Sequence, residues 1–345
     1  MNEEELVNYC YRENVFLNVI VELTNYCNLK CLHCYLIKNT TFLGLNYVTK
    51  LVQKLKKEGT IYVSLTGGEP LSHPDFNKIY KLFKYNGFIV SIKTNSLLLN
   101  NNHIDLFRKL PPSQLNITVY GLSDDEYYEY CGDKYGFTKL EKSLGLLQQN
   151  NVRFSLCTIA DKFHYPRIIN SDYSKYFKKY NRDVEFNYDL YDTNEGDKNP
   201  LSLRINNDKI IEVEKEQFLA NNKKFLNNNP IGNMESLSCK GGICNVAIDS
   251  NGNISVCLMD KKKIKIDFEN WDNLKKYMID RNHEIENMFL NSKCNGCKEA
   301  FLCEKCPFWH SRTINENING FDRCELAKLK RNLFIPISIQ GDILV

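Results

Sequence analysis

Three cysteines on one short segment, Cys27, Cys31 and Cys34, are the residues of this chain best suited to carry chemistry. They are spaced C-x3-C-x2-C and directly follow a strand-like run over residues 16–24. Iron–sulfur clusters usually take four cysteine ligands. A loop that offers three thiolates therefore predicts a cluster with one iron open to another ligand, as a reactive cluster requires. A zinc site with His33 as the fourth ligand is the alternative.

A second, larger group of cysteines lies after residue 238. The group includes two C-x2-C pairs, and the Asn251-Gly252 step within it predicts the turn of a β-hairpin over residues 246–256. Eight cysteines make two complete sets of four, enough for two closed clusters, although the C-x2-C pairs also suit zinc. The eight are Cys239, Cys244, Cys257, Cys294, Cys297, Cys303, Cys306 and Cys324.

The three-cysteine loop, with an aromatic ring (His33) before its last cysteine and Tyr35 after it, resembles the motif of the radical S-adenosylmethionine (SAM) superfamily. In that family the amino and carboxylate groups of SAM chelate the open iron. Reductive cleavage of SAM then yields a 5′-deoxyadenosyl radical, which abstracts hydrogen from an unactivated C–H bond. The resemblance therefore implies a [4Fe-4S] cluster on the loop, with SAM as the cofactor and His33 among its contacts.

Two further segments match the same family. Gly67-Gly68-Glu69-Pro70 follows the second predicted strand, where the family contacts the SAM amino group. Asn95 stands where the family has a Thr-Asn-Gly segment near the SAM ribose, and here Ser96 replaces the glycine. The resemblance thus implies that Gly67, Gly68, Glu69 and Asn95 bind the cofactor.

The second cysteine group resembles the SPASM domain, an extension of radical SAM enzymes that holds auxiliary clusters. The family's spacing after C-x2-C-x5-C is usually x3, and here it is x2. By resemblance, two auxiliary [4Fe-4S] clusters bring the total to three. The first auxiliary cluster takes Cys239, Cys244, Cys257 and Cys306, and the second takes Cys294, Cys297, Cys303 and Cys324.

The elements that position these residues alternate between strand-like and helix-like patterns, which indicates parallel βαβ units. We expect strands at 16–24, 60–66, 88–95, 114–120, 152–159 and 184–190. We expect helices at 45–58, 74–86, 101–109, 123–130, 137–149 and 166–180. The fold class is therefore α/β, and six units fit a partial (β/α)6 TIM-like barrel, as the family resemblance also implies. A small cysteine-rich α+β domain follows it.

Each predicted strand has one apolar and one mainly polar face. In the fourth strand, for example, Leu115 and Ile117 alternate with Asn116 and Thr118. The apolar face suits surrounding helices. Since a closed barrel of this type fills its interior with branched apolar residues, a polar inner face predicts a lumen that holds ligands. An antiparallel sheet with one solvated face does not account for the intervening helices.

Three cysteines remain outside both groups: Cys10, Cys131 and Cys157. A cysteine without a partner is most often a small buried hydrophobe. Cys157 is expected on the lumen face, where a thiol can donate a hydrogen atom to a substrate radical. Cys131 lies at a helix end and is a second candidate for that role.

Composition and charge limit the remaining classes of function and the cellular location. A net charge of +3 in 345 residues gives no argument for nucleic acid or an anionic membrane, and no run is apolar and long enough to span a bilayer. Fourteen cysteines and an acidic N-terminus indicate a cytoplasmic metalloprotein. The expected organisation is an N-terminal extension, the barrel, a linker with a bridging helix near 207–224, the auxiliary-cluster domain and a tail. The boundaries are 1–15, 16–190, 191–238, 239–330 and 331–345.

By resemblance, the chain is expected to modify a ribosomally made precursor peptide. Two closed auxiliary clusters favour a net oxidation that installs a thioether or carbon–carbon crosslink. An electron donor such as flavodoxin or ferredoxin is implied. Because the first barrel strand begins near residue 16, a separate leader-peptide-binding protein is expected. The alternatives are a redox-neutral peptide epimerase, a formylglycine-generating enzyme of the sulfatase-maturing type and, outside enzymes, a zinc-binding interaction module.

Overall fold

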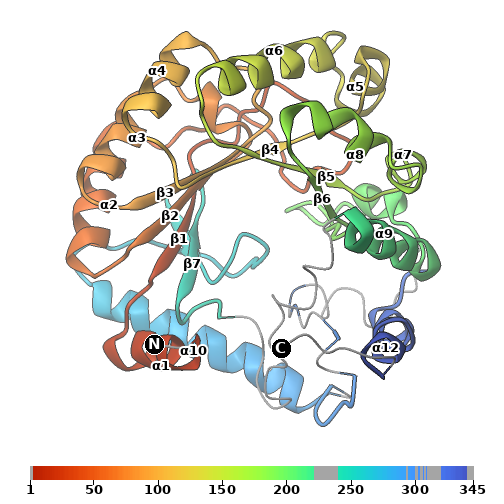
Figure 1. Ribbon diagram of the computed structural model, residues 1–345. Coiled ribbons are helices and arrows are strands. Elements are labelled where there is room, and N and C mark those ends of the chain that lie inside the picture. The colour runs from red at the N-terminus through yellow and green to blue at the C-terminus, as the bar shows by residue number, and fades with distance from the viewer. Residues whose placement is uncertain are drawn as a thin grey trace.

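The computed structural model describes residues 3–220, 240–292, 294–299, 302–303, 306, 308 and 320–339. Its centre is one curved sheet whose strands follow the order β6-β5-β4-β3-β2-β1-β7-β8-β9 (Figure 1). The first six strands are parallel, and each pairs with the next along the chain. They are β1 (Asn18–Glu22), β2 (Tyr62–Thr66), β3 (Ile89–Thr94), β4 (Gln114–Thr118), β5 (Ser155–Ile159) and β6 (Val184–Asn187). The predicted six-stranded partial barrel is thus confirmed.

Helices cover the outer side of this curved sheet (Figure 1). They are α2 (Leu45–Lys57), α3 (Phe76–Tyr85), α4 (Asn101–Lys109), α5 (Asp124–Cys131), α6 (Gly136–Gln149), α7 (Tyr165–Ile169) and α8 (Asp172–Phe177). One prediction differs, because the single helix expected over 166–180 is two. Ser171 has a φ of +57°, and this left-handed conformation ends α7 before α8 begins.

The strand pattern explains how the barrel separates core from lumen. Leu115 and Ile117 of β4 are fully buried, whereas Asn116 and Thr118 between them are only half-buried. In β3, Val90 and Ile92 are buried while Lys93 is exposed. The apolar faces therefore pack on the helices and the polar faces line the inside, as predicted.

Local signals fix both ends of α5, which matters for the site. The Ser123 side chain accepts a hydrogen bond from the backbone N–H of Glu126, and Asp124 and Asp125 in the first turn suit the helix dipole. Gly132 ends the helix with a φ of +76° and donates its N–H to the carbonyl of Tyr128. Cys131 is consequently the last residue of the helix.

The C-terminal part of the chain extends the same sheet. β7 (Asn245–Ile248) pairs in parallel with β1. β8 (Asn253–Ser255) and β9 (Ile264–Lys265) then add antiparallel strands. The predicted hairpin is present, with Gly252 at a φ of +75° in its turn. Tyr47 of α2 donates a hydrogen bond to the Gly252 carbonyl, so the hairpin also contacts the barrel.

Several further elements surround the barrel. They are α1 (Glu3–Glu13), η1 (Pro70–Ser72), η2 (Lys178–Tyr180), η3 (Asn199–Leu203), α9 (Asn207–Ala220), α10 (Trp271–Leu290) and α12 (Arg323–Ile339). The bridging helix predicted near 207–224 is observed as α9, and its expected end lies outside the described residues. The proposed N-terminal extension contains α1, and α12 runs across the proposed boundary at 330. The domain boundaries stay predictions.

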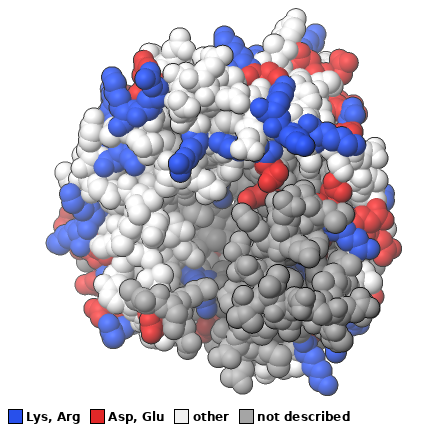
Figure 2. All heavy atoms as spheres, viewed as in Figure 1, with Lys and Arg blue, Asp and Glu red and all other residues white. Residues whose placement is uncertain are grey.

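The surface carries both charge signs. On the face shown in Figure 2, lysine and arginine side chains alternate with acidic ones around the rim, consistent with the small net charge. Across the described segments, no helix is long and apolar enough to cross a membrane.

Candidate active site

The loop that carries Cys27, Cys31 and Cys34, here called the cluster loop, leaves the carboxyl end of β1. It is held by the segment that follows β2. The N–H of Gly68 donates to the carbonyl of Thr24 at 2.7 Å, and the N–H of Glu69 donates to the carbonyl of Tyr26 at 2.8 Å. A Cβ atom on Gly67 would lie 2.4 Å from the Thr24 oxygen, and one on Gly68 would lie 2.2 Å from the Tyr26 oxygen. Both glycines are therefore required for the contact between the two loops.

Glu69 is fully buried between the ends of β2 and β3. One carboxylate oxygen accepts hydrogen bonds from the Thr94 hydroxyl at 2.6 Å and the Leu71 N–H at 3.0 Å, and the other accepts from the Asn95 N–H at 2.8 Å. Burial raises the pKa of Glu69 to about 7, although these hydrogen bonds oppose the shift. The carboxylate thus fastens neighbouring strand ends, while its assignment as a SAM contact stays a proposal.

Asn95 lies against the cluster loop. Its amide nitrogen donates to the side-chain oxygen of Asn28 at 2.9 Å and lies 3.9 Å from the sulfur of Cys27. The following residue, Ser96, has a φ of +61°, in the left-handed region that favours glycine. The structure thus needs that conformation at the position where the family motif has glycine, and serine adopts it here.

The three loop cysteines are half-buried and take part in no disulfide. Burial raises the pKa of Cys27 to about 12 and also raises that of Cys34, and the Lys38 cation lowers both. The pKa of Cys31 is instead lowered, chiefly by a hydrogen bond from Cys131. A set of three thiols on one loop beside a lysine fits a cluster that takes three cysteine ligands.

The same donors suit a single metal ion less well. Within the described part of the chain, no three histidine, cysteine or acidic side chains converge as one ion would need. A cubane cluster requires less convergence, because each cysteine binds a different iron. The ring of His33 is instead within hydrogen-bond distance of the Tyr130 hydroxyl, as described below.

The end of α5 contacts the cluster loop at several consecutive positions. The Cys131 carbonyl accepts from the Lys30 N–H at 2.8 Å, and the Tyr130 carbonyl accepts from the Leu32 N–H at 3.1 Å. The sulfur atoms of Cys31 and Cys131 lie 3.4 Å apart. Cys131 is 1% exposed, so its thiol faces the loop rather than open lumen.

His33 lies in an aromatic stack with a hydrogen bond. Its ring centroid is 5.5 Å from that of Tyr130, with 17° between the planes, and 5.7 Å from that of Tyr120. The Tyr130 hydroxyl lies 2.9 Å from Nδ1 of His33. Burial lowers the pKa of His33 to about 4, so the imidazole is neutral at pH 7. A neutral ring suits stacking against a bound adenosine better than a cationic one.

A buried acid–histidine pair supports Tyr130. The Tyr130 hydroxyl donates to Asp161 at 2.5 Å, and Nδ1 of His164 lies 2.7 Å from the other oxygen of Asp161. Burial opposes ionisation of Asp161, but the bonds from His164 and Tyr130 outweigh it and hold its pKa below the ordinary value. Sequence reasoning missed this pair; its only sequence signal is the i,i+3 spacing after β5.

Polar residues line the lumen in rungs set by the strand register. Lys93, Asn116 and Ser155 are paired across β3, β4 and β5. The next rung pairs Thr118, Cys157 and Glu185 across β4, β5 and β6. The Cys157 sulfur lies 3.6 Å from the Thr118 hydroxyl, and burial raises the pKa of this thiol. Cys157 is therefore a lumen residue, as predicted from its strand face.

At the lumen end of β1, Glu22 is buried and accepts a hydrogen bond from the Tyr35 hydroxyl at 2.9 Å. Burial raises the pKa of Glu22 to about 7. Lys263 from the C-terminal part lowers this pKa, whereas Asp249 raises it. Tyr35 directly follows the last loop cysteine. The Glu22–Tyr35 pair thus lies between the cluster loop and the β7–β9 region.

Members of the second proposed auxiliary set influence one another electrostatically. Burial raises the pKa of Cys303 to about 11, and neighbouring Cys324, Cys294 and Cys297 raise it further, while Arg323 lowers it. Cys303 thus interacts electrostatically with the other three members of the set, while among the described residues no three of them converge as ligands of a single ion.

The first proposed auxiliary set is not seen together. Cys239 lies outside the described residues. Cys306 lies 3.8 Å from the Tyr191 hydroxyl. Cys244 instead contacts Cys10 of α1 in a small buried cluster with Leu17.

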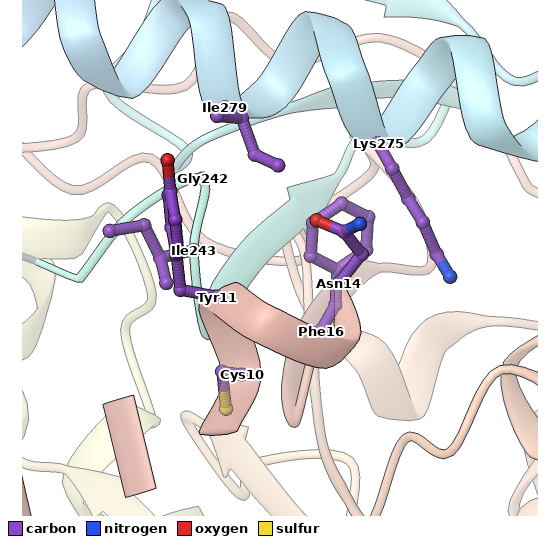
Figure 3. A pocket seen from close by; sticks show the side chains of 8 residues that line it. All are labelled: Cys10, Tyr11, Asn14, Phe16, Gly242, Ile243, Lys275 and Ile279. Atoms are coloured by element: carbon purple, nitrogen blue, oxygen red, sulfur yellow. The ribbon is translucent and has the colours of Figure 1, made fainter. Parts of the chain in front are cut away.

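Figure 3 shows the surroundings of Cys10, a pocket between α1, α10 and the segment that precedes β7. Its lining includes Tyr11, Gly242 and Lys275, and none of the loop cysteines 27, 31 and 34. The ligand-binding residues predicted from the sequence thus lie elsewhere, at the carboxyl ends of the parallel strands, where such folds bind ligands.

Comparisons with known proteins extend this description. A family model described as the Radical SAM superfamily matches residues 21–161. The antilisterial bacteriocin subtilosin biosynthesis protein AlbA of Bacillus subtilis (strain 168) is 28% identical over 144 residues, which are 39% of this chain and 31% of AlbA. The GTP 3′,8-cyclase of Mannheimia succiniciproducens is 29% identical over 136 residues, 37% of this chain and 40% of that protein. The chain thus spans well under half the length of these relatives.

Solved structures match over more of the chain. Streptococcus suis SuiB bound to its precursor peptide SuiA superposes with a TM-score of 0.68 at 17% identity, covering 94% of this chain and 79% of SuiB. The protein anSMEcpe, solved with AdoMet and the Kp18Cys peptide, gives a TM-score of 0.70 at 16% identity, covering 93% of this chain and 98% of anSMEcpe. The shared fold therefore extends beyond the barrel into the cysteine-rich C-terminal part.

Proposed function

We propose that this chain, whose residues 21–161 match the Radical SAM superfamily, is a radical SAM enzyme that modifies a ribosomally made precursor peptide. The observation that carries the proposal is the fold shared over 93–94% of the chain with two proteins whose structures hold peptides. The likeness to AlbA, named for subtilosin biosynthesis, supports the same substrate class.

In this proposal Cys27, Cys31 and Cys34 hold the SAM-binding cluster. When bound, cluster and SAM together supply a 5′-deoxyadenosyl radical that removes a hydrogen atom from a C–H bond of the substrate. The chain's own part is placement. The Gly67-Gly68 contact fixes the loop, and Asn95 and Glu69 tie it to the ends of neighbouring strands. The neutral His33 ring, stacked on Tyr130 beside the loop, is proposed to contact the cofactor.

The polar rungs of the lumen are proposed to hold the peptide. Lys93 and Glu185 are exposed on strands on either side of Cys157. A cation and a carboxylate on opposite sides can orient the amide groups and charged side chains of an extended peptide. The rungs lie before the carboxyl ends of the strands, so a peptide held there would lie next to the cluster loop.

We propose an oxidative crosslink, a thioether or a carbon–carbon bond, as the product. Each bond formed removes two hydrogens from the peptide, one taken by the 5′-deoxyadenosyl radical and one lost as a proton with an electron. An auxiliary cluster held by Cys294, Cys297, Cys303 and Cys324 would supply the acceptor for that electron, and an external donor of the flavodoxin or ferredoxin class would supply the electron that cleaves SAM. The electrostatic effect of Cys294, Cys297 and Cys324 on the Cys303 thiol supports one of these clusters.

Two other reactions have an observation in their favour. Peptide epimerisation needs a thiol that gives a hydrogen atom back, and Cys157 lies on the lumen face. Formylglycine formation starts from a peptide cysteine or serine, and anSMEcpe, which shares the fold, was solved with a peptide named Kp18Cys. Neither proposal changes the residues assigned to the cluster.

The test is anaerobic co-expression with the short open reading frame encoded beside the gene, followed by intact mass measurement of the peptide. Loss of two hydrogens per bond supports the crosslink. An unchanged mass with deuterium uptake from heavy water supports epimerisation and overturns the crosslink. The control is a variant with Cys27, Cys31 and Cys34 all changed to alanine, which should leave the peptide unmodified and SAM uncleaved.

A further inference from the structure

We propose that the thiol of Cys131 donates a hydrogen bond to the sulfur of Cys31 and thereby raises the reduction potential of the SAM-binding cluster. The inference rests on the proposed function, because it assumes that Cys31 is a cluster ligand. It gives Cys131 a positioning role toward the cluster, in place of the hydrogen-atom donor to substrate considered from the sequence.

The geometry around Cys131 is fixed from both sides. Gly132, at a φ of +76°, ends α5 directly after it. The main-chain bonds from Lys30 to Cys131 and from Leu32 to Tyr130 bracket Cys31 on the loop. With both neighbours of Cys31 held to the last two residues of α5, the 3.4 Å separation of the two sulfurs is set by the backbone. A chance approach of two mobile side chains does not account for it.

The direction of the hydrogen bond follows from the chemistry of the ligand. A cysteine bound to iron is a thiolate and can only accept. The proton between the two sulfurs therefore belongs to Cys131, which must donate. Cys131 is 1% exposed, so water does not compete for the bond, and the low local polarity strengthens it.

Hydrogen bonds to cluster sulfurs are one of the main means by which proteins set cluster potentials. Reduction adds negative charge to the cluster, and a donor aimed at a ligand sulfur stabilises that charge. Loss of the donor should make the cluster harder to reduce. Cys157, by contrast, lies on the lumen face beside Thr118 and leaves the loop sulfurs untouched, so it serves as the matched control.

The test compares Cys131→Ala with Cys131→Ser, two residues of similar volume of which only serine retains a donor. The anaerobic holoenzyme is titrated with reductant, and the potential is read from the electron paramagnetic resonance signal that changes when SAM is added. That change separates the SAM-binding cluster from auxiliary ones. We expect the alanine variant to show a roughly tenfold lower ratio of reduced to oxidised cluster at a fixed potential, which corresponds to about 59 mV for one electron. The serine variant and Cys157→Ala should stay near the wild type.

Equal potentials in the alanine and serine variants would overturn the inference, as would loss of the cluster from both, since serine keeps the donor. The proposed function fails separately. A wild-type protein with no SAM-responsive signal would remove the basis for a radical SAM cluster. If the wild-type protein shows the signal and modifies its peptide, but the Cys131 variants have the wild-type reduction potential, only the role of Cys131 is refuted.

Discussion

The hydroxyl group of Tyr130 lies 2.9 Å from Nδ1 of His33 and joins the residue before the last loop cysteine to a buried carboxylate, that of Asp161. Tyr130→Phe removes this hydroxyl and leaves both partners short of a hydrogen bond in a buried setting. The cost of such a loss is about 1–3 kcal/mol. Denaturant unfolding of the anaerobic protein should show that decrease. Tyr128→Phe on the same helix, at a side chain that is 54% exposed, should leave stability unchanged, and a similar loss there would contradict the explanation.

Gly68→Ala should disturb the cluster loop. The new methyl group would lie 2.2 Å from the Tyr26 oxygen, and relief of the clash must separate the two loops. We expect a destabilisation of about 1–3 kcal/mol together with a lower iron content after anaerobic reconstitution. Gly145→Ala in α6 meets no atom within 4 Å and should be neutral or stabilising by about 1 kcal/mol. Normal iron loading of Gly68→Ala would show that the close contact is dispensable.

Glu22→Gln should remove part of the pH dependence of stability. Burial raises the pKa of Glu22 from an ordinary 4.5 to about 7, so the fold favours the protonated acid. Its stabilising contribution is complete below about pH 4.5 and is lost as the pH rises through 7. At 1.36 kcal/mol per unit, the difference between pH 4 and pH 8 is about 3 kcal/mol.

Glutamine can still accept the bond from Tyr35 and does not titrate. The free energy of unfolding of the wild type should therefore fall relative to that of the glutamine variant between those pH values. Parallel curves for the two proteins would mean that the pKa of Glu22 is the same in the folded and unfolded states.

Cys297→Ala tests the auxiliary cluster for which the structure offers the best support. Loss of one [4Fe-4S] cluster should lower the iron content from about twelve to about eight atoms per chain. SAM cleavage should persist, because the loop cysteines are intact. Cys157→Ala provides the comparison with unchanged iron. Iron content that does not fall, with zinc found by elemental analysis, would replace this cluster by a zinc site.

Much of the barrel could be predicted from the sequence because its signals are local. The alternation of Leu115 and Ile117 with Asn116 determines which side of β4 is buried, and the same pattern repeats strand by strand. The spacing of Cys27, Cys31 and Cys34 predicts a cluster on their loop, and this assignment stays a prediction. The break at Ser171 could not be foreseen, since no glycine or proline marks it and its left-handed φ is set by packing.

The contacts that surround the cluster loop could not be predicted for a different reason. Cys131 meets Cys31, and Tyr130 meets His33, only because α5 returns to the carboxyl ends of the strands. The spacing of residues in the sequence does not indicate that α5 ends beside the cluster loop. The same holds for Cys10 and Cys244, which α1 and β7 bring together from opposite ends of the chain.

The parallel pairing of β7 with β1 has a consequence for how the chain folds as it is synthesised. Val19 and Val21 of β1 are fully buried, yet Asn18 and Val21 find their partners Asn245 and Ile248 only after most of the chain has left the ribosome. Until then the nascent barrel presents an open, apolar strand edge to its surroundings. Such late, long-range pairing gives a high contact order and slow final closure. The interval in which the edge is open is when the growing chain is most exposed to misassembly.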